Sequence, residues 1–159
     1  MLDVFGRAAA FTGHRNIEKS EYDALAKRLF LTVDALYREG VYTYYCGGAL
    51  GFDTVAAVTV LNMKAHYPHL RLVMAIPCPE QSAYWSAADK ALYESILRRA
   101  DECVTLSPQY TRDCMMKRNR YMVDHAELLI AYVKRETGGS AATRRYAQKK
   151  GLTILDVTE

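Results

Sequence analysis

The sequence lacks the features that mark metal-binding, disulfide-rich and membrane proteins. Its four cysteines show neither C-x-x-C spacing nor pairing with nearby histidines, which argues against a zinc site or a thioredoxin-like motif. No run approaches the roughly 18 apolar residues of a spanning helix, and the N-terminus has no signal-peptide pattern. We therefore expect a cytoplasmic protein with reduced thiols, no metal site and no membrane association.

An excess of charge of one sign is also lacking. The formal net charge is +3, and the positive residues form neither a tail nor a long basic run, so nucleic acid is not the favoured partner. Basic residues instead recur beside glycine-rich loops, as in Gly13-His14-Arg15 and in residues 134–139. This pattern suits a small anion better than a polyanion.

What the sequence has is a regular alternation of short apolar runs and longer amphipathic segments. Such alternation is typical of βα units that build a parallel sheet. The expected strands are residues 7–11, 42–46, 72–76, 103–106, 128–133 and 153–157. With 159 residues, one core is the default. The sequence predicts one domain over residues 1–159, an α/β, Rossmann-like three-layer sandwich with a mainly parallel sheet of about six strands and helices on both faces.

Helices are expected between these strands. The first should bury the residues that recur at steps of three or four, which are Tyr22, Leu25, Leu29, Val33 and Leu36. The second should begin at Asp53 as its N-cap, carry Val55, Val58 and Leu61 inward, and end near residue 66.

The remaining helices have weaker signals. Ser86 and Asp89 resemble a capping box before a stripe that contains Leu92 and Ile96. A fourth helix is expected to begin near Asp113, and a fifth is expected to follow residues 138–140 and to end before Gly151.

Three glycine-bearing loops should meet at one edge of this sheet, because the carboxyl ends of parallel strands share an edge and ligands bind there. They follow the first, second and fifth expected strands. Glycine lets the backbone approach a phosphate closely, and the next helix offers free N–H groups and a positive dipole end. The alternative is that these glycines only form tight turns. We favour a shared ligand site.

Polar side chains in and near these loops have two interpretations each. Arg15 could clamp a phosphate or only solvate its loop. His14 could contact a ligand or bond locally. Asp53 could cap its helix or accept hydrogen bonds from a ribose.

Two further segments contribute candidates. The loop with Tyr84 and Trp85 could hold a base or cover the core. Residues 117–120 cannot all face one way on a helix, so we choose Arg118 and Asn119 over a fully solvated face. The predicted ligand-binding residues are Gly13, His14, Arg15, Gly47, Gly48, Gly51, Asp53, Glu80, Gln81, Arg118, Asn119, Gly138, Gly139 and Ser140.

Five motifs in order give the chain a family resemblance. They are F-T-G-H-R, C-G-G-A-L-G-F-D, I-P-C-P-E-Q, K-R-N-R-Y-M-V-D and T-G-G-S-A-A-T-R-R-Y-A. Together they resemble the bacterial YpsA-like proteins, a domain of unknown function in the SLOG superfamily of Rossmann-like proteins. The resemblance implies a nucleotide or ADP-ribose-like ligand at the glycine loops and no required cofactor. It also implies a protein partner in cell division or stress responses, and a homodimer is a further expectation.

The SLOG superfamily includes the DNA-processing DprA proteins and the LOG-type phosphoribohydrolases. LOG enzymes carry a helical arginine, which Arg118 resembles, and a P-G-G-x-G-T-x-x-E motif whose acidic residue serves N-glycosidic bond cleavage. Here Ala141 and Ala142 replace the third glycine and the threonine, and Arg144 or Arg145 stands where the acid is expected. A basic side chain cannot act as that acid or base. The catalytic residues are therefore unknown, and the sequence does not decide whether the protein is an enzyme.

Three functions follow from these observations. The first is nucleotide binding or sensing without LOG-type catalysis. The second is hydrolysis or transfer at a nucleotide N-glycosidic or phosphate bond, with a carboxylate from Asp53, Glu80 or Glu136. The third is single-stranded nucleic-acid binding, with Tyr84, Trp85 and Tyr110 as stacking surfaces.

Overall fold

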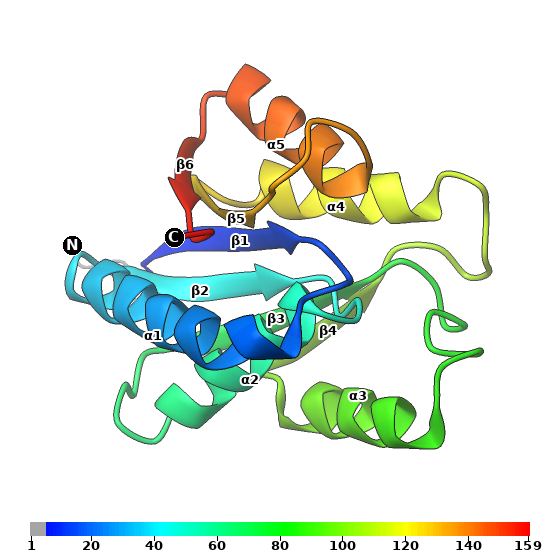
Figure 1. Ribbon diagram of the computed structural model, residues 1–159, viewed down its shortest axis with the longest axis horizontal. Helices are drawn as coiled ribbons and strands as arrows, with labels where there is room; N and C mark the ends of the chain where they lie inside the picture. The colour runs from blue at the N-terminus through cyan, green and yellow to red at the C-terminus, as the bar shows by residue number, and fades with distance from the viewer. Residues whose placement is uncertain (1–5) are drawn as a thin grey trace.

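Six strands form one all-parallel sheet in the computed structural model, which describes residues 6–159 (Figure 1). The strands are β1 (Arg7–Gly13), β2 (Val41–Cys46), β3 (Arg71–Ile76), β4 (Glu102–Thr105), β5 (Leu128–Tyr132) and β6 (Thr153–Asp156). Their order is β4-β3-β2-β1-β5-β6, and every neighbouring pair is parallel. The predicted α/β fold is confirmed. Residues 1–5, which the predicted domain includes, lie outside the described residues.

Helices cover both faces of the sheet and give the three predicted layers. They are α1 (Tyr22–Arg38), preceded by the short 3-10 helix η1 (Lys19–Glu21), α2 (Phe52–Met63), α3 (Ala87–Arg99), α4 (Cys114–Asp124) and α5 (Gly139–Lys149). Figure 1 shows α1, α2 and α3 on one face and α4 and α5 on the other. Two hydrophobic clusters correspond to these two interfaces. No helix within residues 6–159 combines the length and the apolar character needed to cross a membrane.

Strand burial reflects position in the sheet. All five residues of β5 are buried, as expected for a strand covered on both faces. The edge strands β4 and β6 are short and have no buried residues.

The predicted buried face of α2 was partly wrong. Ala56, Ala57 and Val60 are buried, whereas Val55 and Val58 are only partly so. The helix packs against α1 on one side and α3 on the other, and it is apolar around most of its circumference. Periodicity cannot select one inward stripe on such a helix. The helix also ends at Met63, before the predicted residue 66.

Two other buried positions were wrong, whereas one cap was right. Tyr22 at the start of α1 and Leu92 in α3 are exposed. In α3 the buried position falls on Tyr93, whose ring packs edge-on against Trp85. The predicted cap is confirmed, because the Ser86 hydroxyl accepts the Asp89 N–H at 3.1 Å.

The strand order reverses next to β1. The chain runs outward from β1 through β2 and β3 to β4, and then returns to the opposite side of β1 at β5. In open parallel sheets, ligands bind in the crevice at the point where the strand order reverses. In this protein that point lies between the carboxyl ends of β1 and β5. The loops that carry Gly13 and Gly138 therefore lie beside each other at this point.

Candidate functional site

A pocket of about 290 Å³ opens at this switch point. It is formed by the loop after β1, the starts of α2 and α5, and one side of α4. Eight of the fourteen predicted residues line it: Gly13, His14, Arg15, Asp53, Arg118, Asn119, Gly139 and Ser140. The other six lie outside the lining: Gly47, Gly48, Gly51, Glu80, Gln81 and Gly138.

The loop between β2 and α2 is packed against the protein itself. A side chain at Gly47 would meet the Arg118 guanidinium, with an added Cβ only 2.5 Å from Nη1. Gly51 has φ = 79°, and its Cβ would lie 2.2 Å from the Arg15 carbonyl oxygen. The Phe52 N–H, the first of α2, donates to the carbonyl of His14 at 3.0 Å. The predicted phosphate cradle is therefore largely occupied by protein atoms at this loop.

Asp53 supplies this loop with an internal anion. One carboxylate oxygen accepts the Ala49 N–H at 3.1 Å, so Asp53 bonds backwards into the loop and does not cap α2. The N-cap is Gly51, which corrects the predicted start of the helix. Burial raises the pKa of Asp53 to about 6, although nearby Arg118 favours the charged form. Asp53 is thus a proton-accepting group within the pocket at neutral pH.

Arg118 joins the ends of two strands while it lines the pocket. Its buried guanidinium donates from Nη1 to the carbonyls of Gly47 and Ala75, and its Nε donates to Asn119 Oδ1 at 2.8 Å. Gln81 supports this arrangement from the loop after β3, because its Nε2 donates to Gly47 O at 3.1 Å. Burial lowers the pKa of Arg118, yet an arginine remains charged in proteins.

The loop between β5 and α5 is open by contrast. An added Cβ at Gly138 or Gly139 would have nothing within 4 Å. Gly138 is the N-cap of α5, with φ = 94°, and no side chain caps the helix. The first N–H groups of a helix have no partner within the helix itself. The start of α5 therefore presents a positive dipole end to the pocket, which Gly139 and Ser140 line.

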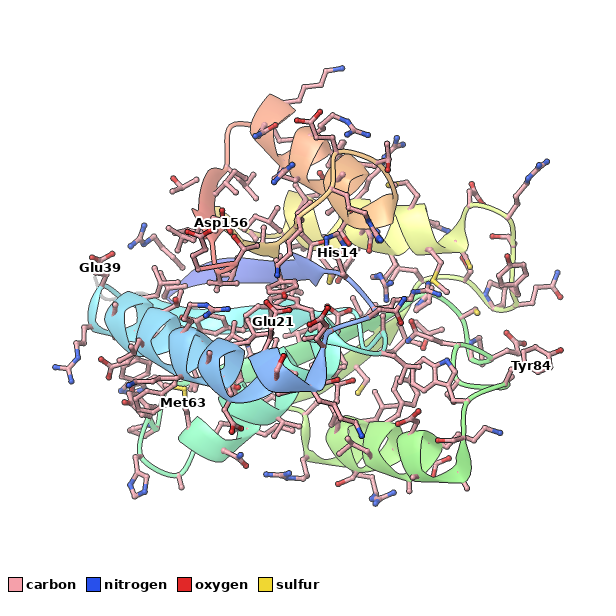
Figure 2. All side chains as sticks on the ribbon, in the orientation of Figure 1. His14, Glu21, Glu39, Met63, Tyr84 and Asp156 are labelled. Atoms are coloured by element: carbon pink, nitrogen blue, oxygen red, sulfur yellow. The ribbon has the colours of Figure 1, made fainter. Side chains whose placement is uncertain are left out.

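His14 connects the two sides of the crevice. Its imidazole is buried, and Nε2 accepts the backbone N–H of Lys134 at 2.7 Å. Its own backbone N–H donates to the Tyr132 carbonyl at 3.3 Å. Figure 2 shows His14 between the β1 end and the α4–α5 pair. His14 thus bonds to the neighbouring loop and lines the pocket, and its predicted contact with a ligand stays a prediction.

Cations surround His14. Its pKa is lowered first by burial and then by the positive charges of Arg135, Lys134 and Arg144. Lys134 is partly neutralised, because its Nζ donates to Glu21 at 2.7 Å. The imidazole is therefore neutral at physiological pH.

Arg135 is the most important pocket residue that the predicted list missed. It lines the pocket from the loop after β5. The sequence did contain a signal, because Lys134 and Arg135 stand shortly before the pair Gly138-Gly139. The predicted list also missed six other lining residues: Phe11, Thr12, Asn16, Ala49, Met115 and Met122.

The loop after β3 does not contribute to the pocket as predicted. Tyr84 is fully exposed and projects outward (Figure 2), whereas Trp85 packs against Tyr93. Glu80 is exposed and lies outside the lining. No cluster of three or more His, Cys, Asp or Glu side chains that could hold a metal ion occurs in residues 6–159.

These features define a Rossmann-like α/β protein with a cationic pocket at the switch point of its sheet. Within this class, the chain belongs to the YspA SLOG family, whose model matches residues 9–154. A similar relative is the SPbeta prophage-derived protein YoqJ of Bacillus subtilis. It is 31% identical over 135 residues, which cover 77% of this chain and 79% of YoqJ.

Solved structures show the same fold. DNA processing protein A from Streptococcus pneumoniae matches 96% of this chain with a TM-score of 0.68 and 17% identity. The Helicobacter pylori protein of the same name matches 96% with a TM-score of 0.66 and 18% identity. This chain spans 50% and 66% of those two chains, respectively.

Proposed function

We propose that the protein binds or senses a nucleotide or nucleotide-derived phosphate ligand in the switch-point pocket. The observation that carries this proposal is the open, uncapped start of α5 beside the Arg15 and Arg135 side chains. A helix N-terminus stabilises a bound anion through its free N–H groups and its dipole. Arginine adds bidentate hydrogen bonds to phosphate.

The rest of the pocket suits the sugar and base of such a ligand. Asp53 and Asn119 carry oxygen atoms that can accept hydrogen bonds from ribose hydroxyls. Met115 and Met122 add apolar, adaptable surface for a base. A volume of about 290 Å³ is at the small end of ligand pockets, so it favours a mononucleotide-sized ligand or portion of a ligand.

Binding without LOG-type catalysis is the first candidate because α5 carries no acid at the expected position. Arg144 and Arg145 stand there, and Arg145 donates to the Glu136 carbonyl at 2.8 Å. The second candidate, a hydrolase or transferase, is supported by Asp53. Of the three carboxylates considered, Asp53 alone lies among the pocket-lining residues.

Single-stranded nucleic acid is the third candidate. The Helicobacter pylori DNA processing protein A is described by its single-stranded DNA binding mode. Its 18% identity to this chain supports a shared fold but no shared ligand. In this chain the stacking candidates Tyr84 and Tyr110 are exposed and lie outside the pocket lining.

A single assay separates the three candidates. The purified protein is incubated with nucleoside monophosphates, nucleoside triphosphates, NAD, ADP-ribose and short single-stranded DNA, and its melting temperature and the products are measured in the same samples. Stabilisation with an unchanged ligand supports binding or sensing. Release of base or phosphate supports an enzyme, and Asp53→Asn should then abolish the turnover.

The variant Arg15→Gln tests the site itself. Arg15 is exposed at the pocket, so its loss should weaken ligand binding without unfolding the protein. Arg98→Gln is a matched control, because it removes the same charge from the last turn of α3. Equal affinities of all three proteins, or no stabilisation by any nucleotide at millimolar concentration, would contradict the proposed function.

A further inference from the structure

His14 faces the pocket with one ring nitrogen already in use. The residue is only 8% exposed, and its Nε2 receives the Lys134 N–H at 2.7 Å. A nitrogen that accepts a hydrogen bond carries no proton, so the ring is neutral and its proton is on Nδ1. A charged imidazolium would instead point an Nε2–H at the Lys134 N–H. The contact with Lys134 therefore makes Nδ1 a hydrogen-bond donor.

The Nδ1–H of His14 lies beside a second hydrogen-bond donor, the guanidinium of Arg135. Nη2 of Arg135 lies 3.5 Å from Nδ1 of His14, and guanidinium nitrogens only donate. Two donors cannot bond to each other, so each needs an acceptor. Within residues 6–159, the hydrogen bonds of His14 provide no acceptor for Nδ1. Both side chains line the same pocket.

We infer that a phosphate oxygen of the ligand binds between Nδ1 of His14 and the guanidinium of Arg135. This inference rests on the proposed function and assigns the place of the ligand's phosphate. The usual length of a charge-assisted hydrogen bond is about 2.8 Å. One oxygen atom can lie at this distance from both nitrogens, because the nitrogens are 3.5 Å apart. We call His14 and Arg135 together the oxyanion seat. Its two hydrogen-bond donors, Nδ1–H of His14 and the guanidinium of Arg135, can share one acceptor.

The surroundings of the seat favour an anion over a neutral acceptor. The uncapped start of α5, at Gly139 and Ser140, lines the same pocket. Arg135, Lys134 and Arg144 together lower the pKa of His14 after the effect of burial, which reports a positive potential at the ring. A bound anion offsets that potential.

The seat also limits the kind of ligand. On the β2 side, the pocket wall carries the Asp53 carboxyl, which disfavours a second phosphate there. Asp53 instead can accept hydrogen bonds from hydroxyl groups. The arrangement fits a phosphate monoester whose hydroxyl-bearing portion extends toward Asp53, and a nucleoside monophosphate is one member of that class.

Nuclear magnetic resonance of His14 tests the seat directly. Long-range 1H–15N correlation spectra of the labelled full-length protein are recorded at pH 7 alone, with inorganic phosphate, with AMP and with adenosine. The free protein should show a neutral ring protonated at Nδ1. Phosphate and AMP should shift the Nδ1 resonance, whereas adenosine should not.

Affinity measurements on two variants complete the test. Arg135→Gln should weaken the binding of AMP and of phosphate by about tenfold or more, because it removes a charge-assisted bond. Lys149→Gln removes the same charge from the exposed far end of α5 and should leave the affinity unchanged. Arg135 is exposed, so its replacement should not unfold the protein.

The possible outcomes separate this inference from the proposed function. A ring protonated at Nε2 in the free protein would overturn the seat. AMP binding with no change at His14, or with equal affinity for Arg135→Gln, would overturn the seat and leave nucleotide binding in place. Binding of adenosine as tight as that of AMP would overturn the phosphate assignment. Absence of binding by both phosphate and AMP would overturn the seat, and the proposed function would be overturned only if the wider nucleotide panel also gave no stabilisation.

Discussion

Two glycine-rich loops at the same edge of the sheet differ in what surrounds their backbone. In the β2–α2 loop, Gly47 and Gly51 contact protein atoms, and the Asp53 carboxylate accepts an N–H of the loop. In the β5–α5 loop, Gly138 and Gly139 have open space around them, and no side chain caps the helix. The β2–α2 loop thus binds the carboxylate of Asp53, whereas the backbone of the β5–α5 loop is free to bind the anion of a ligand. A glycine pair before a helix therefore does not by itself indicate a phosphate site.

Gly51→Ala should have the largest effect on stability. The new Cβ would clash with the Arg15 carbonyl and would be held at a positive φ, so we expect a loss of about 4 kcal/mol of unfolding free energy. Gly151→Ala is the matched control, because Gly151 has a similar φ of 86° with nothing within 4 Å. It should lose only about 1 kcal/mol. Denaturant unfolding measures both losses, and equal losses would show that the β2–α2 loop is not packed as described.

Asp53→Asn should have the next largest effect, and it should depend on pH. The pKa of Asp53 is raised from 3.8 to about 6 in the folded protein. The contribution of protonated Asp53 to the stability of the wild type is therefore complete below about pH 4 and is lost as pH rises through about 6. Asparagine keeps the acceptor for the Ala49 N–H and carries no charge. The variant should be more stable than the wild type by at most about 3 kcal/mol at pH 8.

The pH series also provides the check on this prediction. Urea unfolding of both proteins between pH 4 and pH 8 should show stability curves that meet near pH 4, separate between about pH 4 and pH 6, and keep a constant difference above pH 6. A stability difference that does not change between pH 4 and pH 6 would mean that Asp53 is not a buried internal anion of the β2–α2 loop.

Gly139→Ala should have the smallest effect on folding and a clear effect on binding. The added methyl group has open space and removes a glycine from the first turn of α5, so stability should rise by less than about 1 kcal/mol. The same methyl group blocks the close approach of a phosphate to the helix N–H groups, and AMP affinity should fall by about tenfold. Calorimetric titration measures this loss. Unchanged affinity would remove the β5–α5 loop from the ligand site.

Much of the fold could be predicted from the sequence, because the apolar runs indicate the strands and the apolar stripes of the segments between them indicate the helices. All six strands were located to within about two residues, and the parallel arrangement followed from the helices between them. The errors fall where tertiary packing decides. Leu92 fits the helical stripe as well as Tyr93 does, but Tyr93 is buried beside Trp85 and receives a hydrogen bond from Gln81.

The candidate site could be predicted only in outline. Arg118 and Asn119 were chosen from the polar run at 117–120 because helical geometry lets few of its residues face one way, and both line the pocket. The sequence could not show that Asp53 bonds backwards to Ala49, since a carboxylate at a helix start reads as a cap. It also could not show the His14–Lys134 contact, which joins residues 120 positions apart.

Hydrogen exchange with and without AMP is the most direct test of the contrast between the two loops. We predict that AMP slows amide exchange in residues 12–16 and 138–142 and leaves residues 47–51 almost unchanged. Protection centred on residues 47–51, with no change at the start of α5, would contradict the account.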